Sequence, residues 1–235
     1  MPMIDNYIDN KIGEVLLSKN KEREGNHTKS GKLSASRLGD PLQWQVLYAL
    51  GVPQKEIDQY VVRKFLRGNQ VEDWLVEHLN PISTQEFVEY RNVVGYIDAM
   101  CDTSEWENKL GLIPVEVKSV TSMKFKRIAK EGVQKGHRLQ AGFYALAKGM
   151  THFAICYVNS DDLRVHTIIE ETKNVKDEID KIITDYENAR SSGKIPKFES
   201  SEVWQSNIEY SKYPLRMPLT EEEATEKYLV EKQKQ

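Results

Sequence analysis

Two neighbouring segments of the chain predict a β-hairpin, which constrains the fold more than any other feature. Residues 93–100 and 112–120 are rich in apolar and β-branched side chains, as strands are. The stretch between them, residues 103–111, is polar and ends in glycine, as hairpin connections do. Both strands must enter a sheet, and the sheet must accommodate the charged side chains that they carry.

The charged residues of this hairpin are expected to lie close together. Side chains alternate along a strand, so Glu116 and Lys118 share one face while Val115 and Val117 pack on the other. If the hairpin closes, Asp98 lies beside Glu116. Charged groups flanked by buried valines destabilise a fold unless a partner compensates them. Two carboxylates and a lysine in this arrangement predict a compact site for a divalent metal ion and an attacking water.

The remaining pattern predicts an α/β fold in which helices flank a mixed sheet. Helices are expected over residues 4–16, 41–51, 54–79 (with a break at Gly68), 123–130, 138–148 and 175–192. Further strands are expected over residues 86–90, 152–158 and 163–169. Asp40 is expected to cap the helix that Pro41 begins, and residues 20–32 are expected to form a loop. Helices followed by three strands, a helix, two strands and a helix favour a mixed sheet with helices on its faces.

Length and composition favour one intracellular domain. A chain of 235 residues with 39% hydrophobic residues can bury a substantial core. We divide residues 1–235 into a helical part (1–80), a catalytic core (81–198) and an extension (199–235). Thr220 begins a capping-box pattern, which predicts a charged C-terminal helix that a protein partner could bind. No apolar run is long enough to cross a membrane and the start lacks a secretory pattern, so we expect a soluble, cytoplasmic protein.

Cysteine and charge patterns narrow the function further. Cys101 and Cys156 lie in apolar strand-like runs, so we expect two buried thiols rather than a disulfide. The net charge is −3, but residues 118–138 contain seven Lys or Arg and one acid, a local charge of +6 that leaves −9 for the rest. A basic segment directly after the acidic strands would attract a polyanion to that site. A solvated charged helix remains the alternative.

Three motifs then point to a known family. Residues 95–98 read Gly-Tyr-Ile-Asp, residues 115–118 read Val-Glu-Val-Lys, and residues 140–144 begin with Gln and end with Tyr. In this order they resemble the motifs of the PD-(D/E)xK nuclease superfamily. They are most similar to its RecB-like exonuclease branch, which includes CRISPR-adaptation nucleases and lambda-type phage exonucleases. The resemblance implies a restriction-endonuclease-like core and a deoxyribonuclease that depends on Mg²⁺ or Mn²⁺.

The resemblance also assigns roles to individual residues. Asp98 and Glu116 would be oxygen ligands of Mg²⁺ or Mn²⁺, and the carbonyl of Val117 would complete the set that the protein provides. Lys118 would polarise the attacking water and stabilise the phosphate as its charge develops. The alternative is a surface hairpin that carries an ordinary Glu–Lys pair.

Residues outside the hairpin complete the predicted site. Glu72, four residues after Gly68, resembles an upstream family motif whose last residue faces the metal, although Asp73 and Glu77 compete for this assignment. Gln140 and Tyr144 are four residues apart, so they share one helical face. Their implied role is to support the metal site and hold nucleic acid; the alternative is that Tyr144 is a core residue. Contacts to nucleic acid are expected from Ser34, Ser36, Arg37, Lys124, Lys126, Arg127, His137 and Arg138. N-capping by Ser34 would explain part of this pattern.

The chain departs from many of these relatives in one respect. Relatives often carry one cysteine after a Ser-Arg-Leu entry and three near the C-terminus, which bind an iron–sulphur cluster. Here residues 39–41 and 202–210 contain no cysteine, so we expect no cluster. This departure weakens a CRISPR-associated role and favours a phage, plasmid or repair nuclease of a bacterial or phage-infected cell.

The sequence therefore predicts an exonuclease that acts on DNA ends or single strands in recombination, repair or phage DNA metabolism. A structure- or sequence-selective endonuclease would use the same chemistry and stays open. A nucleic-acid-binding or assembly protein with a vestigial site is the alternative from another class. The intact set of Asp98, Glu116 and Lys118 favours an enzyme.

Overall fold

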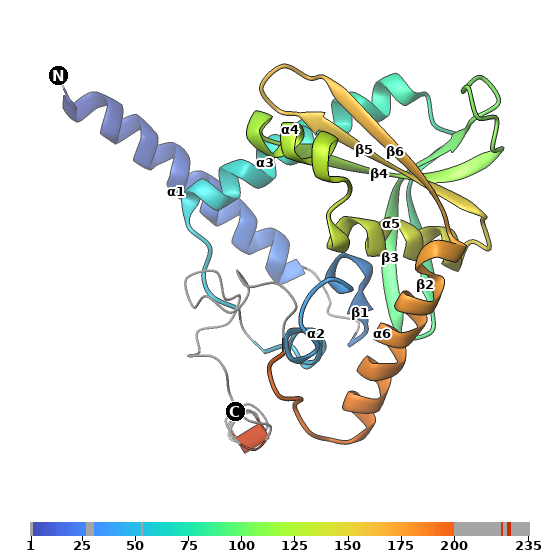
Figure 1. Cartoon of the computed structure of the whole chain (residues 1–235). Helices are drawn as coiled ribbons and strands as arrows, with labels where there is room; N and C mark the ends of the chain where they lie inside the picture. The colour runs from blue at the N-terminus through green and yellow to red at the C-terminus, as the bar shows by residue number, and fades with distance from the viewer. Residues whose placement is uncertain (1, 27–30, 53, 200–221, 223–224, 227–235) are drawn as a thin grey trace.

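The computed structural model describes residues 2–26, 31–52 and 54–199, together with residues 222, 225 and 226. Figure 1 shows the elements along the chain. They are α1 (Pro2–Asn26), β1 (Leu33–Ser34), the 3-10 helix η1 (Ala35–Arg37), α2 (Leu42–Ala49), α3 (Gln59–Leu79), β2 (Ser83–Tyr90), β3 (Val93–Asp102), β4 (Leu112–Val120), α4 (Ser122–Glu131), α5 (Lys135–Ala147), β5 (His152–Asn159), β6 (Val165–Glu171) and α6 (Lys173–Ser191).

The six strands form one mixed sheet in the order β1-β3-β4-β5-β6, with β2 also paired to β3. The predicted hairpin is present, since β3 and β4 pair antiparallel. β4 then pairs parallel with β5, and β5 pairs antiparallel with β6. The prediction of a mixed sheet flanked by helices, as in a restriction-endonuclease-like core, is confirmed.

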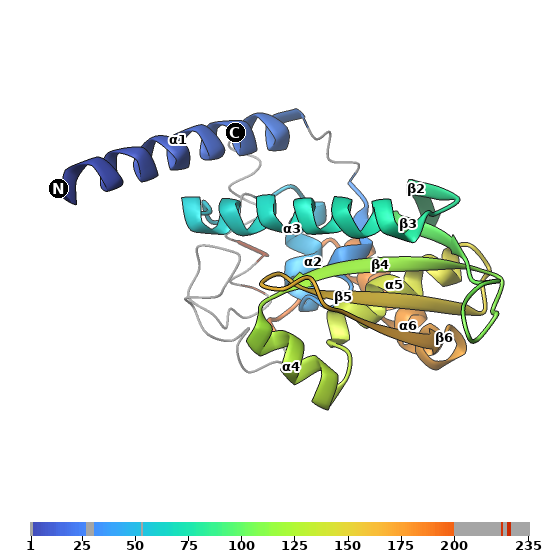
Figure 2. The same ribbon diagram turned by 90° about the horizontal axis from the view of Figure 1, so that it is seen from above.

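Helices cover both faces of the sheet. Figure 2 shows α3 on one side of the strands and α5 with α6 on the other. Val115 and Val117 of β4 pack with Val71 and Leu75 of α3 in one apolar cluster. The larger cluster lies between the sheet and α5 and α6. The alternation predicted for β4 therefore places its valines against α3 and turns its charged residues toward the α5 side.

Several predicted boundaries are wrong for local reasons. α1 continues to Asn26, so the loop predicted from residue 20 begins later. α3 is not broken at Gly68, where the surface is open, but it starts only at Gln59 because Asp58 caps it. The Asp58 Oδ1 atom accepts the Val61 N–H at 2.9 Å.

The predicted capping of α2 is also wrong. Pro41 itself occupies the N-cap position and makes no side-chain cap hydrogen bond. The Asp40 carboxylate instead accepts a hydrogen bond from Arg37 Nη1 at 3.1 Å. An ion pair with a nearby arginine thus replaces the predicted cap.

Other expectations concern the ends and the thiols. Cys101 and Cys156 are both buried, as predicted, and both thiols are free. Among the described residues, no helix is long and apolar enough to cross a bilayer. Residues 202–210 and nearly all of the predicted C-terminal helix from Thr220 lie outside the described residues.

Gly95 of β3 allows α5 to approach the sheet closely. A Cβ atom at this position would lie 2.7 Å from Tyr144 Cε1 and 3.0 Å from Ala35 Cβ. We expect Gly95→Ala to lower the free energy of unfolding by about 2 kcal/mol, because the buried Tyr144 ring and the Ala35 methyl group cannot move aside without strain. Urea unfolding followed by circular dichroism measures this change.

Gly68→Ala is the matched control. An added Cβ at Gly68 meets nothing within 4 Å, and the residue lies inside α3. This variant should be more stable than the wild type by about 0.5–1 kcal/mol, because alanine favours a helix. Equal stability of Gly95→Ala and wild type would contradict the close packing.

Candidate active site

The predicted site lies at a gap along one edge of β3. β2 pairs along one edge of β3 from Val93 to Met100, except at Asp98, so β1 and β4 must share the other edge. β1 pairs only with Val93 and Val94, and β4 pairs only from Ala99 to Asp102. Residues 95–98 therefore have no strand partner on that edge. The sheet opens there, and polar side chains can enter it.

Asp98 occupies this gap. The pairing of Ala99 with Val115 places Asp98 opposite Glu116. Its Oδ2 atom accepts the backbone N–H of Val117 at 2.8 Å, in a place where a regular ladder would supply a carbonyl oxygen. The carboxylate is thus fixed on the backbone of the neighbouring strand, and it is 9% exposed.

Glu116 and Lys118 form an ion pair on β4. Glu116 Oε1 accepts a hydrogen bond from Lys118 Nζ. Glu116 Oε2 is buried and has no hydrogen-bond partner among the described residues. A buried carboxylate oxygen without a donor is costly, so this atom indicates that a cation or a proton belongs there.

Glu72 reaches the same place from α3. It is half-buried, whereas its competitors Asp73 and Glu77 are exposed. The Glu72 Oε1 atom accepts a hydrogen bond from Gln85 Nε2 at 3.1 Å, and the charges of Asp98 and Lys118 act on it. The structure therefore selects Glu72 from the three acids that the sequence left open.

The three carboxylates carry more negative charge than Lys118 balances. Burial, with the charges of Asp98 and Asp73, raises the pKa of Glu72 to about 7 despite the opposing effect of Lys118. Burial, together with Asp98 and Glu72, raises the pKa of Glu116 to about 8, although Lys118 opposes this shift too. Burial also raises the pKa of Asp98. Such clustered shifts are typical of functional sites.

Lys118 remains an ammonium at neutral pH. Burial alone would lower its pKa, but the carboxylates of Glu116, Asp98 and Glu72 outweigh burial and raise the pKa above its ordinary value. Lys118 therefore acts as a fixed cation and not as a general base.

Gln140 and Tyr144 of α5 lie close to the carboxylates, whose charges act on Tyr144. Gln140 Nε2 donates to Tyr144 Oη at 2.9 Å, and both residues are buried. Burial and the nearby Glu116 raise the pKa of Tyr144, so its phenol stays protonated. Tyr144 is thus a core residue against Gly95 and at the same time a neighbour of the acidic cluster.

The predicted nucleic-acid contacts Ser34, Ser36 and Arg37 lie next to α5, and their polar groups interact with other residues of the chain. The hydroxyl oxygens of Ser34 and Ser36 are 2.9 Å apart. Ser34 precedes η1 but makes no capping hydrogen bond through its side chain. The Arg37 guanidinium lies 4.2 Å from the centre of the Tyr48 ring and also binds Asp40. Arg37 therefore makes structural contacts in this state.

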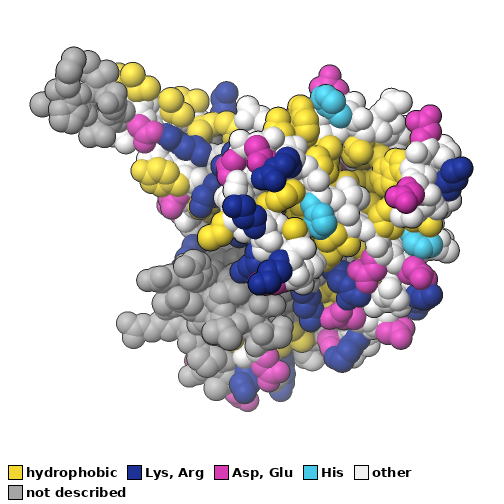
Figure 3. Space-filling view, turned by 45° about the horizontal axis from the view of Figure 1, so that its top comes forward, with side chains coloured by type: hydrophobic (Ala, Val, Ile, Leu, Met, Phe, Trp, Pro, Cys, Tyr) yellow, Lys and Arg dark blue, Asp and Glu magenta, His cyan; other side chains and the backbone are white. Residues whose placement is uncertain are grey.

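The predicted basic residues fall into two groups. Lys124, Lys126 and Arg127 are exposed on α4, which follows β4 directly. Figure 3 shows Lys and Arg side chains gathered on the face that carries α4. Arg138 instead binds the Glu170 carboxylate, with Nε 3.0 and 2.8 Å from its two oxygens, so it stabilises the fold.

His137 lies between the site and α4. Its Nδ1 atom is 3.1 Å from the Tyr157 hydroxyl. Burial, with the charges of Lys118 and Lys124, lowers the pKa of His137 to about 3. The imidazole is therefore neutral, and it cannot contribute a positive charge to a phosphate contact.

The donor set at the gap fits a hard divalent cation. Asp98 and Glu116 provide carboxylate oxygens, and the partnerless Glu116 Oε2 provides a free acceptor. Among the described residues, no three acidic, histidine or cysteine side chains stand together as a complete metal site. The backbone carbonyl of Val117, or a reorientation of the Glu72 side chain, would be needed to complete a metal site.

Sequence reasoning missed two residues around the site. Gln85 of β2 binds Glu72, and Tyr157 of β5 binds His137 and lies beside Lys118 in the register. Tyr157 stands in an apolar run that gave no sign of this contact. Gln85 is one of several polar residues in β2, so its type did not indicate a contact with Glu72.

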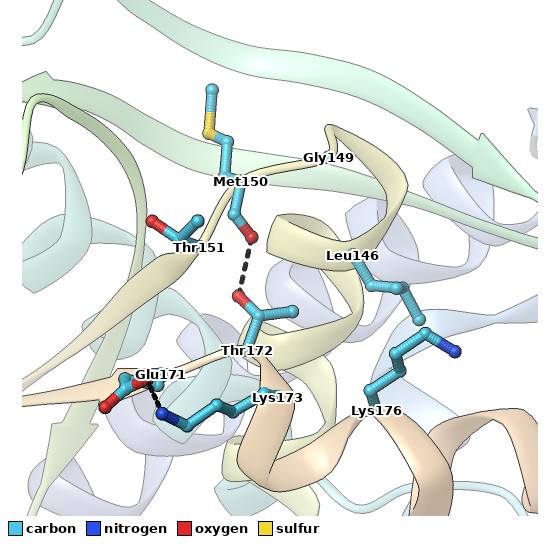
Figure 4. A pocket seen from close by; sticks show the side chains of 8 residues that line it. All are labelled: Leu146, Gly149, Met150, Thr151, Glu171, Thr172, Lys173 and Lys176. Carbon is cyan, nitrogen blue, oxygen red and sulfur yellow. Dashed lines mark hydrogen bonds and ion pairs between the residues drawn. The ribbon is translucent and has the colours of Figure 1, made fainter.

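A hollow elsewhere on the surface takes no part in this site. Figure 4 shows it where the end of α5 meets the start of α6. It has a volume of about 320 Å³ and is lined by Leu146, Gly149, Met150, Thr151, Glu171, Thr172, Lys173 and Lys176. Thr172 Oγ1 donates to the Met150 carbonyl at 2.7 Å, and Lys173 pairs with Glu171. None of the predicted site residues lines it.

Comparisons with known proteins bear on the fold. No family model and no curated protein matches the chain. The crystal structure of SSO0001 is similar, with 18% identity, a TM-score of 0.51, and coverage of 76% of this chain and 86% of the other. An alkaline exonuclease from Laribacter hongkongensis matches with 14% identity, a TM-score of 0.48 and coverage of 69% and 91%. A phage-related exonuclease from Haemophilus somnus 129PT matches with 13% identity, a TM-score of 0.47 and coverage of 68% and 96%.

These likenesses are likenesses of fold. The match to SSO0001, at 18% identity, shows a similarity of fold alone. The candidate site is defined by the chain's own geometry, in which Asp98 and the Glu116–Lys118 pair meet at the gap beside β3.

Proposed function

We propose that the protein is a metal-dependent deoxyribonuclease that hydrolyses phosphodiester bonds, most simply an exonuclease acting on DNA ends or single strands. One observation carries this proposal. Asp98 and Glu116, both buried, meet Lys118 at an opening in the sheet, and Glu116 Oε2 has no donor among the described residues. Recombination, repair or phage DNA metabolism is the context that we propose.

The metal would be Mg²⁺ or Mn²⁺. Asp98, Glu116 and the Val117 carbonyl would hold it, with Glu72 as a further carboxylate. A divalent cation held there supplies a Lewis acid beside the scissile phosphate. The buried carboxylates support this assignment, because burial and, to a smaller degree, the neighbouring carboxylates raise their pKa values, and a bound cation would stabilise their charged forms.

Lys118 would act on the phosphate and the attacking water. Its ammonium is held by Glu116, and its side chain remains 26% exposed, so it is accessible from solvent. A cation fixed before the reaction stabilises charge as it develops without first having to reorganise. Tyr144 and Gln140 of α5 would support the site by packing next to its carboxylates.

The exposed lysines and arginine of α4 would attract the DNA backbone. Lys124, Lys126 and Arg127 follow the catalytic strand directly in the chain. Lys124 also lies close enough for its charge to act on His137, which is beside Lys118. These positively charged side chains would attract the DNA backbone toward the acidic cluster without selecting a base sequence.

Comparing linear with circular DNA tests the proposal. With Mg²⁺ or Mn²⁺ present, the protein should degrade linear duplex or single-stranded DNA, leave closed circles intact and do nothing in EDTA. Cleavage of circles would instead support an endonuclease. Absence of cleavage on every DNA tested would favour a binding or assembly protein and would refute the catalytic proposal.

A further inference from the structure

Gln85 has an unusual backbone for a residue inside a strand. Its φ is +50°, in the left-handed region that a side chain other than glycine rarely adopts. The other described non-glycine residues with positive φ are Asn80, Arg91, Lys109 and Leu163. Each of these lies at the end of a helix or in a connection between strands. Only Gln85, among the residues described, has this conformation within a strand.

The distortion occurs directly opposite Asp98. Thr84 pairs with Ala99, and Glu86 pairs with Ile97, in one continuous register. The pair between them, Gln85 with Asp98, forms no bridge in this ladder. The β2–β3 pairing is therefore interrupted at the residue that supplies a carboxylate to the site.

At this interruption, the side chain of Gln85 forms a hydrogen bond with Glu72. Its Nε2 atom donates to Glu72 Oε1 at 3.1 Å, joining β2 to α3. Glu72 has no other side-chain hydrogen bond among the described residues. A neutral amide donor holds one carboxylate oxygen and leaves the other for a cation. Partners of this kind orient metal ligands.

We propose that Gln85 is a positioning residue of the metal site and that its left-handed backbone directs the amide that orients Glu72. This inference rests on the proposed function, since it deepens the same site. Backbone strain that persists beside such a site is typical of functional positions, where the surrounding structure maintains it. Here the β2–β3 pairs on both sides of Gln85 maintain it.

Gln85→Gly separates this role from an ordinary structural one. Glycine adopts a positive φ without strain, so the variant should have a Tm about 2 °C higher than wild type in EDTA. The same variant loses the amide, so its affinity for Mn²⁺, measured by titration calorimetry, should fall about tenfold. A residue that only stabilises the fold would not move stability and metal affinity in opposite directions.

Three further variants sharpen the test. Lys109→Gly relieves the same kind of strain, at φ +45° in the β3–β4 connection, and should leave Mn²⁺ affinity unchanged. Gln85→Asn adopts this backbone readily but is too short to reach Glu72, so it should lose Mn²⁺ affinity as Gln85→Gly does. In a Glu72→Ala background, Gln85→Gly should cause no further loss.

The outcomes distinguish failure of the role proposed for Gln85 from failure of the proposed nuclease function. Wild-type Mn²⁺ affinity in Gln85→Gly and Gln85→Asn, or tighter binding, would overturn the role of Gln85 while leaving the nuclease proposal in place. A loss that persists in the Glu72→Ala background would overturn it as well. If the wild type binds no Mn²⁺ and cleaves no DNA, the proposed function fails, and the role of Gln85 fails with it.

Discussion

Replacing Lys118 with alanine is expected to lower the rate of DNA cleavage by about 1,000-fold at saturating Mg²⁺ or Mn²⁺. The reason is electrostatic. The carboxylates of Glu116, Asp98 and Glu72 keep Lys118 protonated, so in the proposed mechanism it would stabilise negative charge on the phosphate. Alanine removes this charge and leaves the backbone of β4 able to form the same ladder. Single-turnover cleavage of a labelled oligonucleotide measures the effect.

A surface lysine provides the control. Lys181 lies on α6, pairs with Asp185 and is exposed, so Lys181→Ala makes the same change of charge at a position outside the proposed site. This variant should cleave at the wild-type rate. Wild-type cleavage by Lys118→Ala would remove Lys118 from the mechanism.

Replacing Glu116 with glutamine is expected to stabilise the metal-free protein at pH 8–9 by about 2 kcal/mol and to abolish Mn²⁺ binding. The ordinary pKa of this carboxyl is 4.5, and burial raises it to about 8 in the folded state. Between these values the folded protein holds a proton that the unfolded chain has released. Wild-type stability in EDTA therefore falls as the pH rises through this window, and it stays low above it.

The glutamine variant lacks this contribution of Glu116. Its stability should fall less steeply between pH 4.5 and pH 8, and the two proteins should differ least below pH 4.5, where Glu116 of the wild type becomes protonated in both the folded and the unfolded state. Urea unfolding across this pH range, with EDTA present, measures the two slopes. The ion pair from Lys118 to Glu116 would dominate instead if the variant were less stable than wild type at pH 8.

Much of the site followed from local sequence rules. The alternation of a strand and a short connection were enough to predict that Glu116 and Lys118 share a face and that Asp98 lies near them. The selection of Glu72 came from its spacing after Gly68, and the structure places it, rather than Asp73 or Glu77, beside Asp98.

Other features depend on partners that are distant in the chain. Arg138 looked like a contact for nucleic acid, but Glu170 of β6 binds it from 32 residues away. The positive φ of Gln85 arises from the pairing of β2 with β3, and nothing in the local sequence requires it. The start of α2 was missed for a local reason, because Asp40 pairs with Arg37, three residues away, and does not cap the helix.

The gap beside β3 makes the sheet two halves that meet along a short seam. β1, β2 and β3 form one half and carry Asp98; β4, β5 and β6 form the other and carry Glu116 and Lys118. The seam consists of the pairs from Ala99–Val115 to Asp102–Leu112. Beyond this seam, the hydrogen bond from Val117 N–H to Asp98 Oδ2 also joins the two halves. If a cation binds between the two carboxylates as proposed, it would connect the two halves of the sheet where the backbone ladder does not.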